Sequence, residues 1–196
     1  VTVTDLAAYF DDEITAMPNL VTVGAGGTAS TVAGIPFFSA DNSIYTHDVS
    51  GTDDTAQHNA AYGIGAMDAI TTGDQNSALG YNALSANNTG AQNTAMGRLS
   101  LEANTSGDNN TAYGSSTLSA NSTADDNTAI GKGSMQANTT GAANTAVGKD
   151  SLKANTTGTR NLAIGYQAYT ASDTENDNLA IGYNAMVTNT AGGTEN

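Results

Sequence analysis

The chain of 196 residues has no cysteine and no tryptophan, and it has only two prolines. Without cysteine, a disulfide framework and thiol chemistry are excluded. No stretch approaches the roughly 20 consecutive apolar residues of a membrane-spanning helix, and none resembles a signal peptide. We therefore expect no membrane insertion. The sequence starts at Val1 and stops at Asn196 inside a repeated phrase, which suggests part of a longer polypeptide.

Positive charge is also scarce. The formal net charge is −14, and there are only five basic residues. These residues are scattered along the second part of the chain: Arg98, Lys132, Lys149, Lys153 and Arg160. Phosphate binding needs clustered lysine and arginine, so we expect no nucleic-acid partner. An acidic surface would keep an extended protein soluble or help to hold divalent cations between chains.

Side chains that carry catalysis or ligate metals are few. The only histidines are His47 and His58. Each serine of the repeats has counterparts in other coils with no histidine beside them, so a Ser/His/Asp arrangement is not expected. The adjacent carboxylates of Asp125 and Asp126 are expected to be solvated charges in a corner of the coil. The densest candidate for a cation site is "HDVSGTDD" at residues 47–54, and a solvated linker explains this segment better. We expect no enzymatic activity, no resident metal and no cofactor.

What the chain does have is a repeat. A phrase beginning with asparagine recurs every 17 residues without insertion, from "NAAYG" to two copies of "NLAIG". We call each 17-residue unit a coil and number its positions as columns from this asparagine. Column one comprises Asn59, Asn76, Asn93, Asn110, Asn127, Asn144, Asn161 and Asn178. A fixed period of this kind is typical of solenoid proteins.

Other columns are just as regular. Column three is always alanine, column four is always apolar, and column nine is large and apolar. Column five comprises Gly63, Gly80, Gly97, Gly114, Gly131, Gly148, Gly165 and Gly182. An invariant glycine fits a turn with positive φ or a close approach by another backbone. Two glycine positions and an "NTTG" turn in each coil argue against helices.

The pattern predicts an all-β parallel β-solenoid. In "TAIG", strand alternation places columns two and four on one face and alanine on the other. We expect a second short strand through columns eight to eleven, as in "SMQA". Each strand would pair with its copies in adjacent coils, and the asparagines would stack as ladders of amide hydrogen bonds. Eight coils would form a rod about 40 Å long.

Each coil supplies only one or two large apolar side chains. One chain therefore buries little apolar surface per ordered residue. Because both faces of the "TAIG" strand are apolar, one face can fill the coil while the other meets neighbouring chains. We expect a homotrimer about an axis.

The phrase "NTAIGKGSMQANTTG" resembles the head repeats of YadA-type trimeric autotransporter adhesins, which form a left-handed parallel β-roll. It is more similar to the "NTAIGxxALxxNTTG" arrays of bacteriophage tail fibres and other appendage proteins. The resemblance covers about residues 59–196. It implies a trimeric left-handed β-roll, and a virion protein as attachment partner. The longer coil, and the lack of a neck motif, stalk or membrane anchor after the repeats, favour the virion fibre.

Residues 1–58 differ in composition and are predicted to form an attachment or capping module. "TDLAAYFDDEITAMP" predicts a short amphipathic helix over about residues 5–17, ended by Pro18. The following Gly-rich segment predicts short strands. Residues 59–196 would then form the array of eight coils, truncated at the C-terminus.

These inferences favour a structural fibre of a bacteriophage virion that projects or forms a host-recognition device. The alternatives are the head of a bacterial surface adhesin and, through the threonines of column fourteen, an ice-binding solenoid. Recognition of a host polysaccharide or protein would use residues that break the pattern. In column six these are Tyr81, Tyr166 and Tyr183, which either stack on a sugar or cover alanine and glycine surface. The Asn-x-Thr/Ser triplets of column twelve follow from the repeat itself.

Overall fold

The computed structural model describes residues 30–32, 35–40, 43–45, 55–171 and 173–187. These residues form eleven β-strands and no helix. The helix predicted over residues 5–17 and the candidate cation segment 47–54 lie outside the described residues. Strands β1 (Ser30–Val32), β2 (Ile35–Ala40) and β3 (Ser43–Tyr45) fall in the segment for which short strands were predicted.

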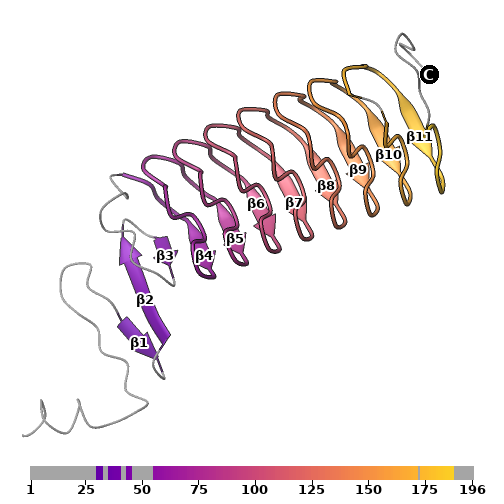
Figure 1. The fold of residues 1–196 in the computed structure, drawn as a ribbon. Helices are drawn as coiled ribbons and strands as arrows, with labels where there is room; N and C mark the ends of the chain where they lie inside the picture. The colour runs from indigo at the N-terminus through magenta and orange to yellow at the C-terminus, as the bar shows by residue number, and fades with distance from the viewer. Residues whose placement is uncertain (1–29, 33–34, 41–42, 46–54, 172, 188–196) are drawn as a thin grey trace, which may run out of the picture.

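The first three strands lead directly into the array. β1 pairs antiparallel with β2, and β2 pairs antiparallel with β3. β3 then pairs in parallel with β4, Ile44 lying opposite Ala60 and Tyr45 opposite Ala61. All eleven strands are hydrogen-bonded in chain order (Figure 1). The described part of the N-terminal module is therefore continuous with the sheet of the coils.

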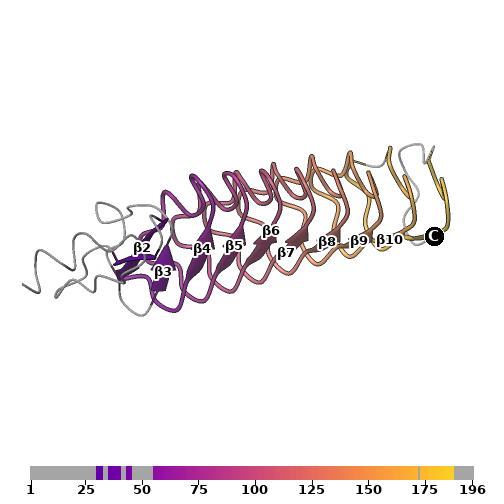
Figure 2. The ribbon, with the colours of Figure 1, turned by 90° about the horizontal axis from the view of Figure 1, so that it is seen from below.

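The other eight strands are parallel copies of one another, and each occupies columns two to four of its coil. Their bounds are β4 Ala60–Tyr62, β5 Ser77–Leu79, β6 Thr94–Met96, β7 Thr111–Tyr113, β8 Thr128–Ile130, β9 Thr145–Val147, β10 Leu162–Ile164 and β11 Leu179–Ile181. Each residue pairs with the residue 17 positions later, as Ala95 does with Ala112. The predicted parallel β-solenoid of 17-residue coils is confirmed. Its strands form a row along one side of the rod (Figures 1 and 2).

The two faces of each strand differ as strand alternation predicts. The alanines of column three are buried, for example Ala112 and Ala129, both fully. The residues of columns two and four are exposed or partly exposed, among them Tyr113, which is 56% exposed. The face bearing alanine lines the interior, and the face bearing the larger residues points to the outside of this chain.

The second predicted strand, through columns eight to eleven, is wrong. These residues form turns, and the leucine or methionine of column nine has a left-handed backbone, with φ of 53° at Leu84 and 50° at Leu118. Columns eight and nine are both buried, as at Thr117 and Leu118. Two successive inward side chains are incompatible with strand alternation. The left-handed backbone at column nine directs its side chain into the interior, next to that of column eight.

Coils still pair through their backbones in this turn region. Leu101 N donates to Thr117 O at 3.0 Å, and Ala103 N donates to Ser119 O at 3.1 Å. The same bonds recur one coil later, from Leu118 N to Ser134 O at 3.1 Å. Pairing between coils therefore runs around most of the circumference. It holds column nine in a backbone conformation that costs an L-residue about 1 kcal/mol or more in isolation.

The interior is narrow and mixed. A single row of large side chains from column nine fills it, beside the small residues of columns three and eight. The fully buried members of this row include Met67, Leu84, Leu101, Leu118, Met135, Leu152 and Tyr169. Two rows of buried asparagine complete the interior. The array leaves the outer face of the strands uncovered.

Candidate functional site

The column-one asparagines join coils through the backbone. Asn93 N donates to Asn76 Oδ1 at 2.9 Å, and the same bond recurs between each adjacent pair from Asn59 to Asn178. The Nδ2 group instead closes its own coil, as from Asn93 to Gly107 O at 2.8 Å. Amide-to-amide contacts in this column occur only as longer secondary bonds of 3.2 Å.

The amide ladder lies in column twelve instead. Asn104 Nδ2 donates to Asn87 Oδ1 at 2.8 Å, and Asn121 Nδ2 donates to Asn104 Oδ1 at 2.9 Å. The same Nδ2 groups also donate to the carbonyl of column fifteen, as from Asn121 to Ala124 O at 3.1 Å. The ladder continues to Asn155, whose Oδ1 has no partner among the described residues; the next residue of the column is Ser172.

This ladder also bears on the glycosylation triplets. The asparagines of those triplets are Asn104, Asn121, Asn138 and Asn155, all fully buried. Each Nδ2 is held by two acceptors inside the solenoid. A sugar cannot be attached to a buried, hydrogen-bonded nitrogen in the folded array.

The column-five glycines have a steric role. Gly80 has φ of +141°, and a Cβ added to it would lie 2.6 Å from Gly97 O. Each of the eight has a positive φ. These glycines let the chain turn between the strand and column six, and they place column six at the edge of the sheet.

The carboxylates near column sixteen also have structural contacts. Asp125 Oδ1 accepts from Asp108 N at 2.8 Å, and Asp108 Oδ1 accepts from Ala91 N at 2.7 Å. In the described part of the chain, no three histidine, cysteine, aspartate or glutamate side chains gather where a metal ion could be held. Nor does any helix there have the length and apolar character to cross a bilayer.

The threonines of column fourteen are exposed but do not lie in a strand. Column thirteen beside them uses its hydroxyls within the solenoid, as from Thr105 Oγ1 to Ser122 O at 3.0 Å and from Thr139 Oγ1 to Thr156 O at 2.9 Å. A flat array of free hydroxyls, as the ice-binding alternative requires, would therefore be one residue wide.

Column six is where the sequence prediction placed candidate binding residues. Tyr166 and Tyr183 stack, with ring centroids 5.3 Å apart and ring planes 10° from parallel. Tyr81 lies five coils before Tyr166, roughly 24 Å along the rod, so it is not part of the same cluster. The structure thus brings together two of the three predicted tyrosines and separates the third.

Basic side chains accompany the tyrosines. Lys149 Nζ lies 5.0 Å from the centroid of the Tyr166 ring, and the Arg98 guanidinium lies 5.8 Å from that of Tyr81. Such cation–π contacts contribute about 0.5–1 kcal/mol at exposed sites. The basic residues are therefore not simply scattered: two of the five are placed beside column-six tyrosines.

One aspartate organises the larger cluster. Asp150 Oδ2 is 2.6 Å from Lys149 Nζ, and its Oδ1 is 3.1 Å from Lys153 Nζ. Only 12% of the Asp150 side chain is exposed, against 47% and 44% for the two lysines. Desolvation acts to raise the pKa of Asp150, but the hydrogen bonds from Lys149 and Lys153 outweigh it, and the pKa lies below its ordinary value.

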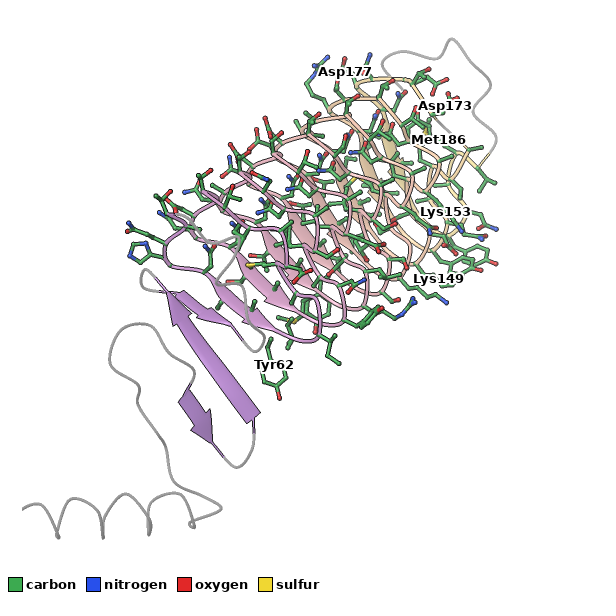
Figure 3. The ribbon with its side chains drawn as sticks, turned by 60° about the vertical axis from the view of Figure 1, so that its left-hand side comes forward. Tyr62, Lys149, Lys153, Asp173, Asp177 and Met186 are labelled. Atoms are coloured by element: carbon green, nitrogen blue, oxygen red, sulfur yellow. The ribbon has the colours of Figure 1, made fainter. Side chains whose placement is uncertain are left out.

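The lysine cluster and the acidic side chains lie on different flanks. Figure 3 shows Lys149 and Lys153 on one side of the last coils and Asp173 and Asp177 on the other. Asp177 is paired with Arg160, whose Nε is 2.6 Å from Asp177 Oδ1. The sequence interpretation missed the lysine cluster. The recurrence of lysine in column six of successive coils, at Lys132 and Lys149, is the signal that could have found it.

The exposed large apolar residues form the second notable surface, which we call the apolar stripe. All of them come from columns two, four and six, and they are between 37% and 78% exposed. They are Tyr62, Ile64, Leu79, Tyr81, Tyr113, Ile130, Ile164, Tyr166, Leu179, Ile181 and Tyr183. Exposed apolar side chains gathered in rows are typical of interaction sites.

Comparison with protein-family models, with curated proteins and with solved structures finds no match to this chain. The assignment of function therefore rests on the repeat, the apolar stripe and the column-six cluster.

Proposed function

We propose that the chain is a structural fibre segment of a bacteriophage virion, a tail or capsid appendage that projects or forms a host-recognition device. The observation that supports this best is the combination of an uninterrupted parallel stack with an apolar stripe along its whole length. The stack supplies a stiff rod, and the stripe supplies a surface on which identical rods associate.

The apolar stripe is large enough for stable self-association. Seven of its side chains lie in columns two and four, on the strand face, and they are about half exposed on average. At about 200 Å² for a large side chain, these seven expose on the order of 700 Å². A standard protein interface buries about 800 Å² per partner. The apolar area of the strand face alone is therefore close to that of one side of a standard interface.

Parallel copies fit this surface without adjustment. Column four is apolar in every coil, so a second copy in the same orientation presents apolar groups at the same spacing along the rod. A cyclic arrangement about an axis parallel to the rods closes the association, whereas a head-to-tail arrangement would continue it. We propose three copies, with the N-terminal module joining the trimer to another virion protein.

The first experiment is the solution mass of the chain by light scattering, together with thermal unfolding over a dilution series. We expect three times the chain mass of 19.6 kDa and an unfolding midpoint that falls on dilution. The variant Tyr113→Lys places charge in the apolar stripe and should dissociate the trimer. Thr123→Lys, on an exposed residue outside the stripe, is the matched control. A wild-type monomer at micromolar concentration would overturn the proposal of self-association.

The head of a bacterial surface adhesin is the second candidate, since the same stack and stripe would serve it. Antibodies against the chain distinguish the two in immunogold electron microscopy of the source culture. We expect label on virus particles. Label confined to the bacterial surface would replace the fibre proposal with the adhesin.

A further inference from the structure

Column six changes character halfway along the array. In the first four coils it holds Ile64, Tyr81, Arg98 and Ser115, and in the last four it holds Lys132, Lys149, Tyr166 and Tyr183. The second set, two lysines followed by two tyrosines, forms one continuous row. Successive backbone bonds hold it in register: Asp150 N to Lys132 O at 3.0 Å, Gln167 N to Lys149 O at 3.0 Å, and Asn184 N to Tyr166 O at 2.9 Å.

The surroundings of this row are positive in a strongly acidic chain. Columns four to eleven of the last four coils contain three lysines and one aspartate, a formal charge of +2. The same columns of the first four coils contain Asp68, Arg98 and Glu102, a charge of −1. The whole chain carries −14, so three of its five basic residues gather on this one flank.

The cationic and aromatic groups are held in place before any ligand binds. Asp150 anchors the ammonium groups of Lys149 and Lys153, and Lys149 Nζ lies over the Tyr166 ring. Tyr166 in turn stacks on Tyr183. Lys132 forms no ion pair with another described residue and is exposed. Side chains fixed in this way lose less conformational entropy on binding.

The residue types of column six fit a protein–protein interface less well than those of column four. Lysine is depleted in the cores of protein interfaces. Column four carries no charge in any coil, whereas column six carries three basic residues. The strand face is therefore the better partner for another copy. Column six lies beyond the turn glycine, at the edge of that face.

We infer that Lys132, Lys149, Tyr166 and Tyr183, with Lys153 beside them, form a binding platform for an acidic polysaccharide whose sugars carry carboxylates. Lys149 and Tyr183 cover the two faces of the Tyr166 ring, so the ring face offered to the C–H groups of a pyranose is that of Tyr183, which is 76% exposed. The ammonium groups, about one coil apart, pair with successive carboxylates. The row spans three coil steps, about 14 Å, enough for a short run of sugars. The inference rests on the proposed role in host attachment and names its ligand class.

A single-stranded nucleic acid also uses aromatic stacking and positive charge. It is disfavoured here because its groove must follow a phosphate chain, and this platform has three lysines in a chain of net charge −14. The two ligand classes are separated by direct comparison.

The test uses the full chain and four probes: polygalacturonate and alginate as polyuronates, amylose as a neutral polysaccharide, and a thymidine 20-mer as single-stranded DNA. Binding is measured by biolayer interferometry at 50 mM and 500 mM NaCl. We expect saturable binding to at least one polyuronate, weakened at least tenfold at the higher salt, with amylose at least tenfold weaker. Absence of binding to both polyuronates, or equal binding of amylose or the 20-mer, would overturn the inference.

Substitutions in the row test whether it is the site that binds the polyuronate. The double variants Tyr166→Ala/Tyr183→Ala and Lys132→Gln/Lys149→Gln should each lower polyuronate affinity at least tenfold. The matched control is Tyr81→Ala/Arg98→Gln, which removes the other cation–π pair of column six and should change affinity less than twofold. Equal losses in the control, or none in the row variants, would contradict the assignment.

The solution mass of the same variants separates this inference from the proposed function. If the row variants keep the wild-type mass and unfolding midpoint, a loss of binding belongs to the platform. If the tyrosine double variant dissociates the chain, the row is part of the self-association surface and the platform is overturned, while the fibre proposal is strengthened. A monomeric wild type that binds polyuronate would instead refute self-association and leave the platform supported.

Discussion

The inside and the outside of each coil follow different rules. Inside, the same residue types recur in every coil: asparagine in column one, alanine in column three and a large apolar residue in column nine. Outside, column six holds isoleucine, tyrosine, arginine, serine and lysine. Each interior residue contacts the residue of the same column in the coil before and in the coil after. A substitution there must therefore fit three coils at once. Exterior residues of one chain have no such requirement.

Residues that repeat in every coil therefore indicate the fold, whereas residues that differ between coils are the candidates for function. A residue that repeats in every coil is explained by stacking, including asparagine and glycine, which elsewhere suggest turns or sites. A residue that departs from its column has to be explained by something outside the stack. The lysines and tyrosines of column six in the last four coils are such residues. Substitutions inside and outside should therefore differ in their effect on stability.

The largest effect is expected at the turn glycine. In Gly97→Ala, the new Cβ would lie 2.5 Å from Gly114 O, on a backbone with φ of +139°. Both the strain and the clash fall in the middle of the stack, so we expect a loss of about 3 kcal/mol or more in the free energy of unfolding. Chemical denaturation measures it. The control Ser115→Ala, in column six of the next coil, should stay within about 0.5 kcal/mol of the wild type.

The next effect concerns the single row of large interior side chains. Leu118 is fully buried, and Leu118→Ala would leave a cavity between coils that are held rigidly by backbone pairing. We expect a loss of about 2–5 kcal/mol. Tyr113→Ala removes an even larger side chain from the outer face of the same coil and is the comparison. Measured at a dilution where the chain is monomeric, it should cost less than Leu118→Ala; the reverse order would refute the assignment of inside and outside.

The asparagine ladder gives an intermediate effect. In Asn121→Ala, the buried Asn104 Oδ1 loses its donor, while Ala124 O and Asn138 Nδ2 each keep one other hydrogen bond. Buried polar groups left without a partner cost about 1–3 kcal/mol, so we expect a loss in that range. Thr123→Ala, two residues later and exposed, should be close to neutral. If the two variants are equally stable, the buried amides do not contribute as the ladder implies.

The sequence predicted the period, the parallel pairing and the separation of columns two and four from column three on opposite strand faces, but it left open which face lines the interior. It did so because strand alternation and a fixed repeat leave few alternatives. The second strand was wrong because leucine and methionine give no local sign of a left-handed backbone. In Leu84 or Leu118 that conformation is imposed by pairing with the neighbouring coils and by the need to bury columns eight and nine together.

The candidate site was predicted only in part for a similar reason. Column membership identified Tyr166 and Tyr183 as residues that break the pattern, and their stacking follows from the repeat. The ion pairs of Asp150 could not be predicted so easily, because Lys149 is its immediate neighbour and Lys153 lies across the left-handed turn of column nine. The contact between Lys153 and Asp150 depends on that turn, and the extended strand that was predicted here would not bring the two side chains together.

The smallest effect is a pH dependence at the ion pairs of Asp150. The pKa of Asp150 is lowered in the folded chain, so its pairing with Lys149 and Lys153 stabilises the fold above the ordinary aspartate pKa of about 3.9. This contribution is lost as the pH falls through the lower, folded-state value. Because the lysine partners are exposed, we expect less than about 1 kcal/mol. Thermal unfolding of the wild type and of Asp150→Asn between pH 6 and pH 2 measures it. The variant should begin less stable and lose less on acidification, since it has no carboxylate to protonate at this position. Identical pH profiles would mean that Asp150 positions the lysines without stabilising the coil.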